Sequence, residues 1–551
     1  MKEKIYLITT PLKETFKKEN KNIFLHPWIE ENKIKFFDYP NNNQMINNNN
    51  YCLNLYEKIL PEISTILNKI HKSDFNLEFW KFFLGPWLKI FISILNDRWK
   101  RIENFNNNNF YSNTYAISYK SDDLAENSHE SFMQAVKTDY WNSIIYNKIL
   151  KFTNACDIEE VPYKKNNSQL KNSKFDIKNL IKKRQNYLFI NTYLSPIEEI
   201  SINLKLKQFP ILRKKFIELP QFNYIAEIRN EPVKQIENYE FEKFLFLNIF
   251  KYMPRVFLEG FFEIDKVIDS EKFPKNPKGI FCGIIPENSH VLKYLAMQKI
   301  RKTKIITVQM GGDSSYYDFH RSQKQEISNT FLSWCKTRTN KNIRNLGYIK
   351  KKFVCKNPEK IVMFLYNSPK YIYKPDVIGY RMYNGYIERI INFIGKLHLE
   401  IQNKLLIRII GHDNWSQKKK ILKYYPHIKF SDENTKINEI YKNTKFIIST
   451  YLGTTIFEAL VSNIPACLLI DENEMAAIDN KQKLYFDILK NINILHSNLN
   501  ECSDHINNLL DGNNLKIWWN SNETKKNLSK FKNEMCFNNP KLIENIISVV
   551  R

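Results

Sequence analysis

The sequence predicts an α/β protein with two domains, each built on a doubly wound parallel sheet. At 551 residues the chain is longer than one hydrophobic core normally supports. From about residue 361 onward, short apolar runs alternate with helical patterns, which is typical of parallel strands joined by crossover helices. We therefore expect an N-terminal domain over residues 1–345, with a helical insertion at about 53–183, and a C-terminal domain over residues 346–551.

The alternation is clearest between residues 445 and 471. Phe446–Ser449 is a short apolar run of the kind that forms a strand buried on both faces. A turn at Gly453 follows, and the next residues predict a helix that ends at about Val461, before an Asn-Ile-Pro stop. Ala466–Ile470 supplies the next strand. This order of elements predicts two parallel strands joined by a right-handed crossover.

The start of this helix is a natural anion-binding site. The first free N–H groups of the helix, and its positive dipole end, face the space beyond the preceding strand. Gly453 allows a close backbone approach, and Thr454 and Thr455 add hydroxyl donors. Glu458 has two interpretations, because it either completes a capping box with Thr455 or contacts a ligand. The arrangement favours a phosphate, such as the diphosphate of a nucleotide sugar.

Further donor-binding candidates follow other predicted strands. In open α/β sheets, ligands bind beyond the carboxyl ends of the strands. Arg408 lies inside the strand expected at 405–410, where it either contacts phosphate through its planar donors or pairs structurally. The remaining candidates come directly after strands, and they are Asn367, Ser368, His412, Asp413, Gly311 and Gly312.

The amino-acid composition limits the binding partners and the cellular compartment that we expect for this protein. A net charge of +25 would ordinarily suggest nucleic acid, but the sequence has no dense arginine cluster and no RNA-binding aromatic motif. We expect no nucleic-acid partner, and at most peripheral contact with an anionic membrane. The eight cysteines are scattered without a Cys-x-x-Cys pair, as is typical of core residues in a reducing compartment. No signal peptide or membrane-spanning run is apparent, so we expect a cytoplasmic protein.

Several blocks of residues resemble known families. Tyr451, Gly453, Thr454, Thr455 and Glu458 together resemble the donor-domain block of GT-B glycosyltransferases and of the related polyol-phosphate transferases. Further blocks, in order along the chain, resemble a family of transferases encoded in bacterial O-antigen and surface-polysaccharide loci. These blocks are Leu84–Leu88 with Asp97 and Arg98, Asp139–Asn142, Pro254–Gly260, and Gln309–Gly312 leading to Leu332–Trp334.

Three carboxylates are candidates for the general base that an acceptor hydroxyl would need. Asp97 and Asp139 belong to blocks that carry the family resemblance, and Glu259 lies in an apolar neighbourhood where burial raises a carboxyl pKa. Two of them have a structural alternative: Asp97 pairs on a helix surface, and Glu259 is a buried salt-bridge partner. No Asp-x-Asp motif is present, so we expect no metal site and a metal-independent reaction.

The resemblance implies a GT-B-like fold, in which two Rossmann-like domains face a central cleft. It implies a glycosyltransferase that moves a sugar from a nucleotide-activated donor to a saccharide or lipid-linked saccharide acceptor, with no further cofactor. Two alternatives remain: a polyol-phosphate transferase that uses a CDP-linked donor, and a catalytically silent binding or scaffold protein. Met310 suggests the last, because it stands where the family commonly has a histidine before the glycines.

Overall fold

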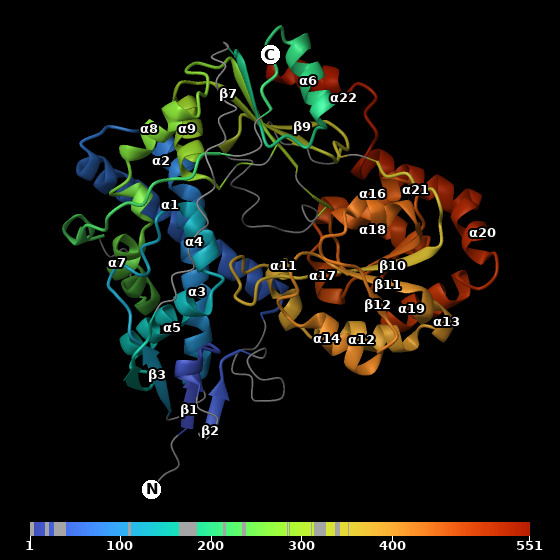
Figure 1. The fold of residues 1–551 in the computed structure, drawn as a ribbon, viewed down its shortest axis with the longest axis horizontal. Helices are drawn as coiled ribbons and strands as arrows, with labels where there is room; N and C mark the ends of the chain where they lie inside the picture. Colours follow the sequence, from blue (N-terminus) through green and yellow to red (C-terminus); the bar gives the residue numbers. More distant parts are fainter. Residues whose placement is uncertain are drawn as a thin grey trace.

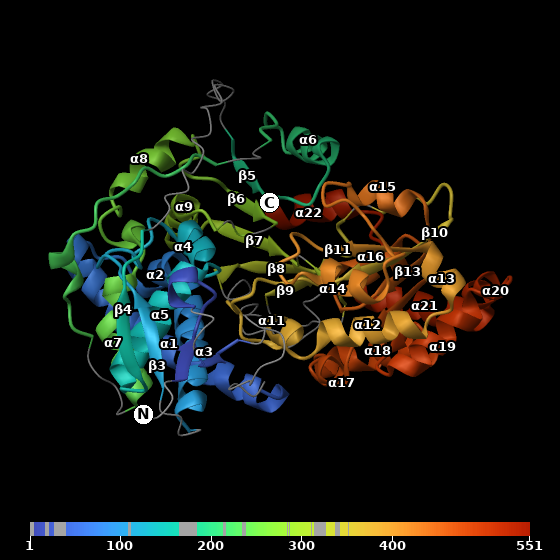
Figure 2. The ribbon, with the colours of Figure 1, turned by 60° about the horizontal axis from the view of Figure 1, so that its bottom comes forward.

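The computed structural model places two groups of elements side by side, with the N-terminal part of the chain and α22 in one group and the elements from β10 to α21 in the other (Figures 1 and 2). Three separate parallel sheets form the framework. Among the residues described, no helix is both long and apolar enough to cross a membrane. The structure describes residues 5–16, 21–26, 40–107, 112–164, 185–212, 216–233, 239–283, 285, 287–309, 311–312, 327–336, 342–350 and 352–551.

The first sheet has four parallel strands in the order β2-β1-β3-β4. Helix α3 packs against α1, α2, α5 and α7, and most of its residues are buried, Asp97, Arg98 and Arg101 among them. The elements are β1 (Ile5–Ile8), β2 (Lys21–Phe24), α1 (Asn42–His71), α2 (Leu77–Phe83), α3 (Gly85–Asn107), β3 (Asn113–Ile117), α4 (His129–Ala135), α5 (Asp139–Thr153) and β4 (Asp157–Val161).

The middle sheet has five parallel strands in chain order, β5-β6-β7-β8-β9. Its last helix comes from the far end of the chain, because α22 packs against β6, β7 and α6 (Figure 1). The elements are β5 (Tyr187–Ile190), α6 (Pro196–Lys205), α7 (Glu240–Tyr252), α8 (Glu263–Ser270), β6 (Gly279–Cys282), α9 (Ser289–Ile300), β7 (Lys304–Val308), β8 (Thr330–Ser333), β9 (Ile343–Asn345) and α22 (Leu542–Val550).

The C-terminal sheet has six parallel strands in the order β12-β11-β10-β13-β14-β15, which is the doubly wound order 3-2-1-4-5-6. Its strands are β10 (Lys360–Leu365), β11 (Leu405–Ile409), β12 (Lys429–Phe430), β13 (Thr444–Ser449), β14 (Ala466–Leu469) and β15 (Leu495–His496). Its helices are α11 (Val377–Tyr380), α12 (Tyr386–Lys396), α13 (Leu399–Lys404), α14 (Gln417–Tyr424), α15 (Ile437–Lys442), α16 (Thr454–Val461), α17 (Glu472–Ala476), α18 (Asn480–Asn491), α19 (Leu499–Leu509), α20 (Asn514–Asn520) and α21 (Asn522–Met535).

The predicted α/β class with parallel sheets is confirmed, and the C-terminal sheet has the doubly wound order that the sequence predicts. The N-terminal half differs in detail from the single sheet that we expected. The stretch at about 53–183 is not only helical, because it contributes β3 and β4 to a sheet of their own with β1 and β2. Long-range pairing of β1 with β3 sets this arrangement, and local periodicity carries no information on it. The boundary near residue 345 stays a prediction.

His129, the first residue of α4, leads to a testable pH dependence. It is 2% exposed, and burial lowers its pKa from 6.5 to about 4. The folded state then binds fewer protons than the unfolded state between these two values, so stability is complete above pH 6.5 and falls as the pH drops towards 4. At pH 5 this one group should cost about 2 kcal/mol of unfolding free energy relative to pH 8.

We therefore expect His129→Gln to make the unfolding free energy less dependent on pH. Urea unfolding at pH 8 and pH 5 measures this difference for the wild type and for the variant. The matched control is His412→Gln, because the side chain of His412 is 80% exposed and should change the dependence little. An unchanged slope in His129→Gln would contradict the assignment.

Candidate functional site

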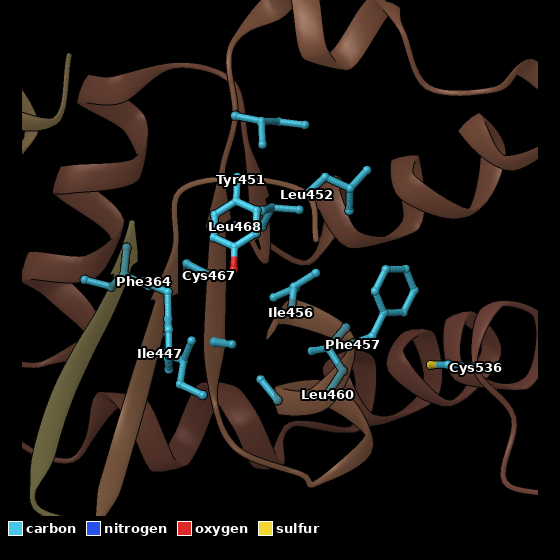
Figure 3. Packing of buried hydrophobic residues seen from close by; sticks show 14 of the residues in the cluster. Phe364, Ile447, Tyr451, Leu452, Ile456, Phe457, Leu460, Cys467, Leu468 and Cys536 are labelled. Carbon is cyan, nitrogen blue, oxygen red and sulfur yellow. The ribbon is translucent and has the colours of Figure 1, made fainter. Parts of the chain in front are cut away.

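The predicted strand–turn–helix–strand unit is present at residues 444–469. Strand β13 leads through a turn to α16, and α16 leads to β14, which pairs in parallel with β13. Figure 3 shows Ile456 and Leu460 of α16 beside Ile447 of β13 and Cys467 of β14. These four side chains are at most 1% exposed, so α16 is held against the sheet by its apolar face.

The N-terminal end of α16 is capped by Gly453, and no side chain caps it. Tyr451 lies next to this end. Its hydroxyl shares a 2.8 Å hydrogen bond with the hydroxyl of Thr455. A Cβ on Gly453 would lie 2.2 Å from the Tyr451 ring, so only glycine fits beside that ring. Thr454 is partly exposed. The hydroxyl of Thr455 is therefore already engaged, whereas the Thr454 side chain is half-buried.

The glycine turn after β7 lies directly against the start of α16. A Cβ on Gly312 would lie 2.3 Å from the Phe457 ring and 2.6 Å from the Gly453 carbonyl oxygen. Gly311 and Gly312 come from the N-terminal half, and Gly453 and Phe457 come from the C-terminal half. The structure therefore brings together two of the predicted donor-binding segments from opposite halves of the chain. Met310 lies outside the described residues.

Glu458 neither caps α16 nor faces its first turn. The cap residue is Gly453, which rules out the capping box with Thr455. The Tyr441 hydroxyl donates to Glu458 Oε2 at 3.1 Å, and Lys350 Nζ lies 3.9 Å from Oε1. Burial raises the pKa of Glu458, although Lys350 and Tyr441 act against this rise. Its contacts are structural ones, on the side of the helix that faces Lys350.

The other predicted donor-binding residues gather near the carboxyl ends of β10 and β11, but most bind within the protein. Arg408 donates to Ser431 Oγ at 3.3 Å and to the Glu433 carbonyl at 2.9 Å, so its role is the structural one. Asp413 accepts hydrogen bonds from the first N–H groups of α14. Asn367 donates to the His412 carbonyl, and the Ser368 carbonyl accepts from the indole of Trp415. His412 itself is largely exposed, with Glu433 at 3.5 Å.

Two of the three candidate bases are committed to arginines. Glu259 forms a 2.6 Å salt bridge with Arg229, both side chains being at most 3% exposed. Asp97 contacts Arg98 at 2.5 Å and Arg101 at 3.0 Å. Burial alone would raise the pKa of Asp97, but Arg101, Arg98 and hydrogen bonding lower it overall. A carboxylate stabilised in this way is a poor proton acceptor at neutral pH.

Asp139 differs from the other two, because no arginine binds it among the residues described. It is the first residue of α5 and is half-buried. The Tyr371 hydroxyl donates to its Oδ1 at 2.8 Å. Tyr371 follows the carboxyl end of β10 by a few residues, so this hydrogen bond places Asp139 near the carboxyl edge of the C-terminal sheet.

Sequence reasoning missed a buried polar cluster that joins the two halves. The Tyr380 hydroxyl donates to Asp97 at 2.7 Å, and the Arg101 guanidinium lies 5.0 Å from the centre of the Tyr383 ring. We call Arg98, Arg101, Asp97, Tyr146 and His26, together with Tyr371, Tyr380 and Tyr383, the arginine cluster. The only signal in the sequence was the resemblance around Asp97-Arg98 and Asp139–Asn142, and the structure joins these blocks through Arg98 Nε and Asn142 at 2.9 Å.

One group of side chains among the residues described has the composition of a metal site. Cys467, His496 and His505 place one ligand atom each within 4.8 Å of one another. Cys467 Sγ donates to the Asn493 carbonyl at 3.6 Å, and the same carbonyl lies 2.9 Å from His496 Nε2. This group is formed by β14, β15 and α19, not by the turn that precedes α16. The predicted metal-independent reaction stays a prediction.

The described sheets and the junction at α16 define an α/β protein whose C-terminal sheet has the order of nucleotide-binding domains. The chain matches the LIC12162 family of transferases over residues 5–549 and belongs to that family; it is a transferase. A comparison with curated proteins finds no match.

Solved structures offer only distant similarity. The UDP co-structure of S. aureus MnaA is 11% identical, with a TM-score of 0.37, and the similarity covers 66% of this chain and 95% of that one. Anabaena Alr3699/HepE with UDP and glucose is 9% identical, with a TM-score of 0.35, over 66% and 99%. The wall teichoic acid polymerase TagF is 11% identical, with a TM-score of 0.30, over 52% and 83%. All three TM-scores lie below 0.5, so the function proposed next is based on the family and on this chain's own residues.

Proposed function

We propose that this transferase is a glycosyltransferase of the GT-B type, which moves a sugar from a nucleotide-activated donor to a surface-polysaccharide or O-antigen acceptor. The acceptor is a saccharide or a lipid-linked saccharide. The reaction takes place in the cytoplasm, with the basic protein peripheral to the inner face of the membrane, and needs no metal or further cofactor.

The observation that carries this proposal is the meeting of the Gly311–Gly312 turn with the start of α16. A helix start without a side-chain cap leaves N–H groups for an anion, and the helix dipole favours negative charge there. The glycine turn from the other half adds backbone that approaches closely, because Gly312 has no side chain. A diphosphate leaving group held at this junction would contact both halves at once.

Asp139 is the residue that we assign as general base. Asp97 and Glu259 are held by arginines, whereas Asp139 is half-buried and accepts a hydrogen bond from Tyr371. In this role Asp139 takes the proton from the acceptor hydroxyl as that oxygen attacks the donor sugar. The N–H groups at the start of α16 stabilise the negative charge that develops on the departing phosphate.

A thermal-shift panel with CMP, CDP, UDP, GDP and TDP tests the donor site. We expect one nucleoside diphosphate to raise the melting temperature, because a ligand that binds only the folded state stabilises it. A response to CMP in place of a diphosphate would instead favour the polyol-phosphate transferase. No response to any nucleotide would contradict both and favour the catalytically silent protein.

Thr454→Pro sharpens this test. Thr454 is the first residue of α16, a position where proline is tolerated, and the extended backbone of Gly453 suits a residue before proline. The substitution removes one N–H donor to the phosphate, and we expect nucleotide affinity to fall by about 10-fold to 100-fold. The matched control is Glu472→Pro, at the first position of α17 after Asp471, whose backbone is also extended. Equal affinity in Thr454→Pro and the control would contradict the proposed phosphate site.

A further inference from the structure

We propose that the arginine cluster binds an anionic group of the acceptor, a phosphate or a carboxylate. This inference rests on the proposed function, because it assigns the anion to the acceptor rather than to the donor. It concerns a place in the fold that differs from the start of α16. The two arginines belong to α3, in the N-terminal half, and the site lies at the edge of the first sheet.

The cluster buries two arginines beside one aspartate. Arg98 and Arg101 are both at most 1% exposed, and Asp97 lies between them at 2.5 Å and 3.0 Å. Asp97 raises the pKa of Arg101, against the opposite effect of burial. Burial lowers the pKa of His26, so this side chain is neutral and adds no charge. Asp97 therefore contacts both guanidinium groups, and a buried charged group is unfavourable unless its hydrogen-bonding atoms are satisfied.

Two hydrogen-bond donors in the cluster have no partner among the described residues. Arg98 donates through Nε to Asn142 and through Nη1 to Asp97, whereas its buried Nη2 has no partner among the described residues. The buried hydroxyl of Tyr146 also has none. A guanidinium N–H is purely a donor and a phenol donates readily, so both suit an anion's oxygens. Buried polar atoms without partners are uncommon in folded proteins and call for a ligand.

The cluster also lies where a ligand is expected from the topology. His26 follows Leu25 just beyond β2, and its ring lies 5.5 Å from the ring of Tyr146. Thr10 follows Thr9 just beyond β1, is fully buried, and its hydroxyl has no partner among the described residues. Strands β1 and β2 are parallel neighbours, so both residues lie at the carboxyl edge of the first sheet. Ligands bind outside this edge in open parallel sheets.

The C-terminal half closes the site. Tyr371 and Tyr383 place their rings near the guanidinium groups of Arg98 and Arg101, at 5.8 Å and 5.0 Å from ring centre to carbon. Tyr380 donates to Asp97. All three tyrosines follow β10 and precede α12. When the two halves separate, the arginines become accessible from the same side as Asp139, which Tyr371 also contacts. An anion bound here would hold the acceptor beside the proposed base.

Thermal shift with inorganic phosphate and with glucuronate, in a buffer that contains neither phosphate nor carboxylate, tests this inference. We expect at least one of them to raise the melting temperature, and the one that does so identifies the anionic group. In Arg98→Met the apparent affinity should fall at least tenfold, while the response to the cognate nucleotide is kept. The control is Arg389→Met, which removes a half-buried arginine paired with Asp471 at 2.8 Å in the other half.

Two further variants test the proposed anion site. Thr454→Pro should retain the melting-temperature response to the anion, because Thr454 belongs to the proposed donor site at the start of α16 and not to the arginine cluster. Tyr146→Phe keeps the ring and removes only the hydroxyl. It should therefore lower the affinity for the anion severalfold, and this test is independent of whether Arg98→Met folds. A wild type that responds to neither anion, or variants that respond as the wild type does, would overturn the inference and leave water as the occupant.

Discussion

We expect Asp97→Ala to lower the free energy of unfolding by about 3–5 kcal/mol, because it leaves two buried guanidinium groups without their carboxylate. The side chains of Asp97, Arg98 and Arg101 are all at most 1% exposed. The substitution also leaves the Tyr380 hydroxyl without the carboxylate that now accepts its hydrogen bond. Equilibrium unfolding in urea, followed by tryptophan fluorescence, measures the change.

The control for Asp97→Ala lies on the same helix. Glu103 pairs with Lys100 at 2.6 Å, but both side chains are about half exposed, at 46% and 45%. Glu103→Ala should therefore change the unfolding free energy by about 0.5 kcal/mol or less. If Asp97→Ala and Glu103→Ala lower the free energy of unfolding by similar amounts, the arginine cluster does not contribute the stability that we assign to it. In Asp97→Ala, saturating phosphate should also restore part of the lost stability if the arginines bind anions.

The second large effect is expected from Gly312→Val. Any side chain here meets the Phe457 ring at 2.3 Å and the Gly453 carbonyl at 2.6 Å. Phe457 cannot move away easily, because its ring packs between Trp334 and Phe531, at 6.2 Å and 6.1 Å between centres. The junction between the two halves must then open. We expect a loss of about 1–3 kcal/mol in stability and a fall of about tenfold or more in nucleotide affinity.

A double variant tests whether the losses of stability and nucleotide affinity come from crowding between position 312 and Phe457. Phe457→Leu removes the ring that blocks a side chain at position 312, so Gly312→Ala combined with Phe457→Leu should lose less than the two single variants add up to. Urea unfolding and the nucleotide titration provide both readouts. Simple additivity of the two changes would show that the ring and the glycine do not compete for the same space.

The sequence predicts the C-terminal half well because each element there carries its own signal. The strand expected at 405–410 appears as β11, and the alternation expected from about residue 361 begins with β10. Short apolar runs, a cap and a stop within about 30 residues of one another determine these elements locally, so periodicity is enough.

The candidate site was harder to predict, because its contacts join distant parts of the chain. Gly312 meets Gly453, and Tyr380 meets Asp97, across separations that no local pattern encodes. Arg408 and Asp413 were well placed at strand ends, yet both are used by neighbouring loops and helices. Residue type and position select groups that suit phosphate, but only tertiary structure shows whether a group is already engaged.

The position of α22 has a consequence for biosynthesis. Its buried face, with Ile546, Ile547 and Val550, lies against β6 and β7, and Gly279 makes room for it because a Cβ there would meet the Val550 carbonyl at 2.5 Å. Strands made early during translation therefore stay uncovered until residues 542–550 have left the ribosome. Until then the N-terminal half of the nascent chain exposes an apolar surface of the kind that chaperones bind.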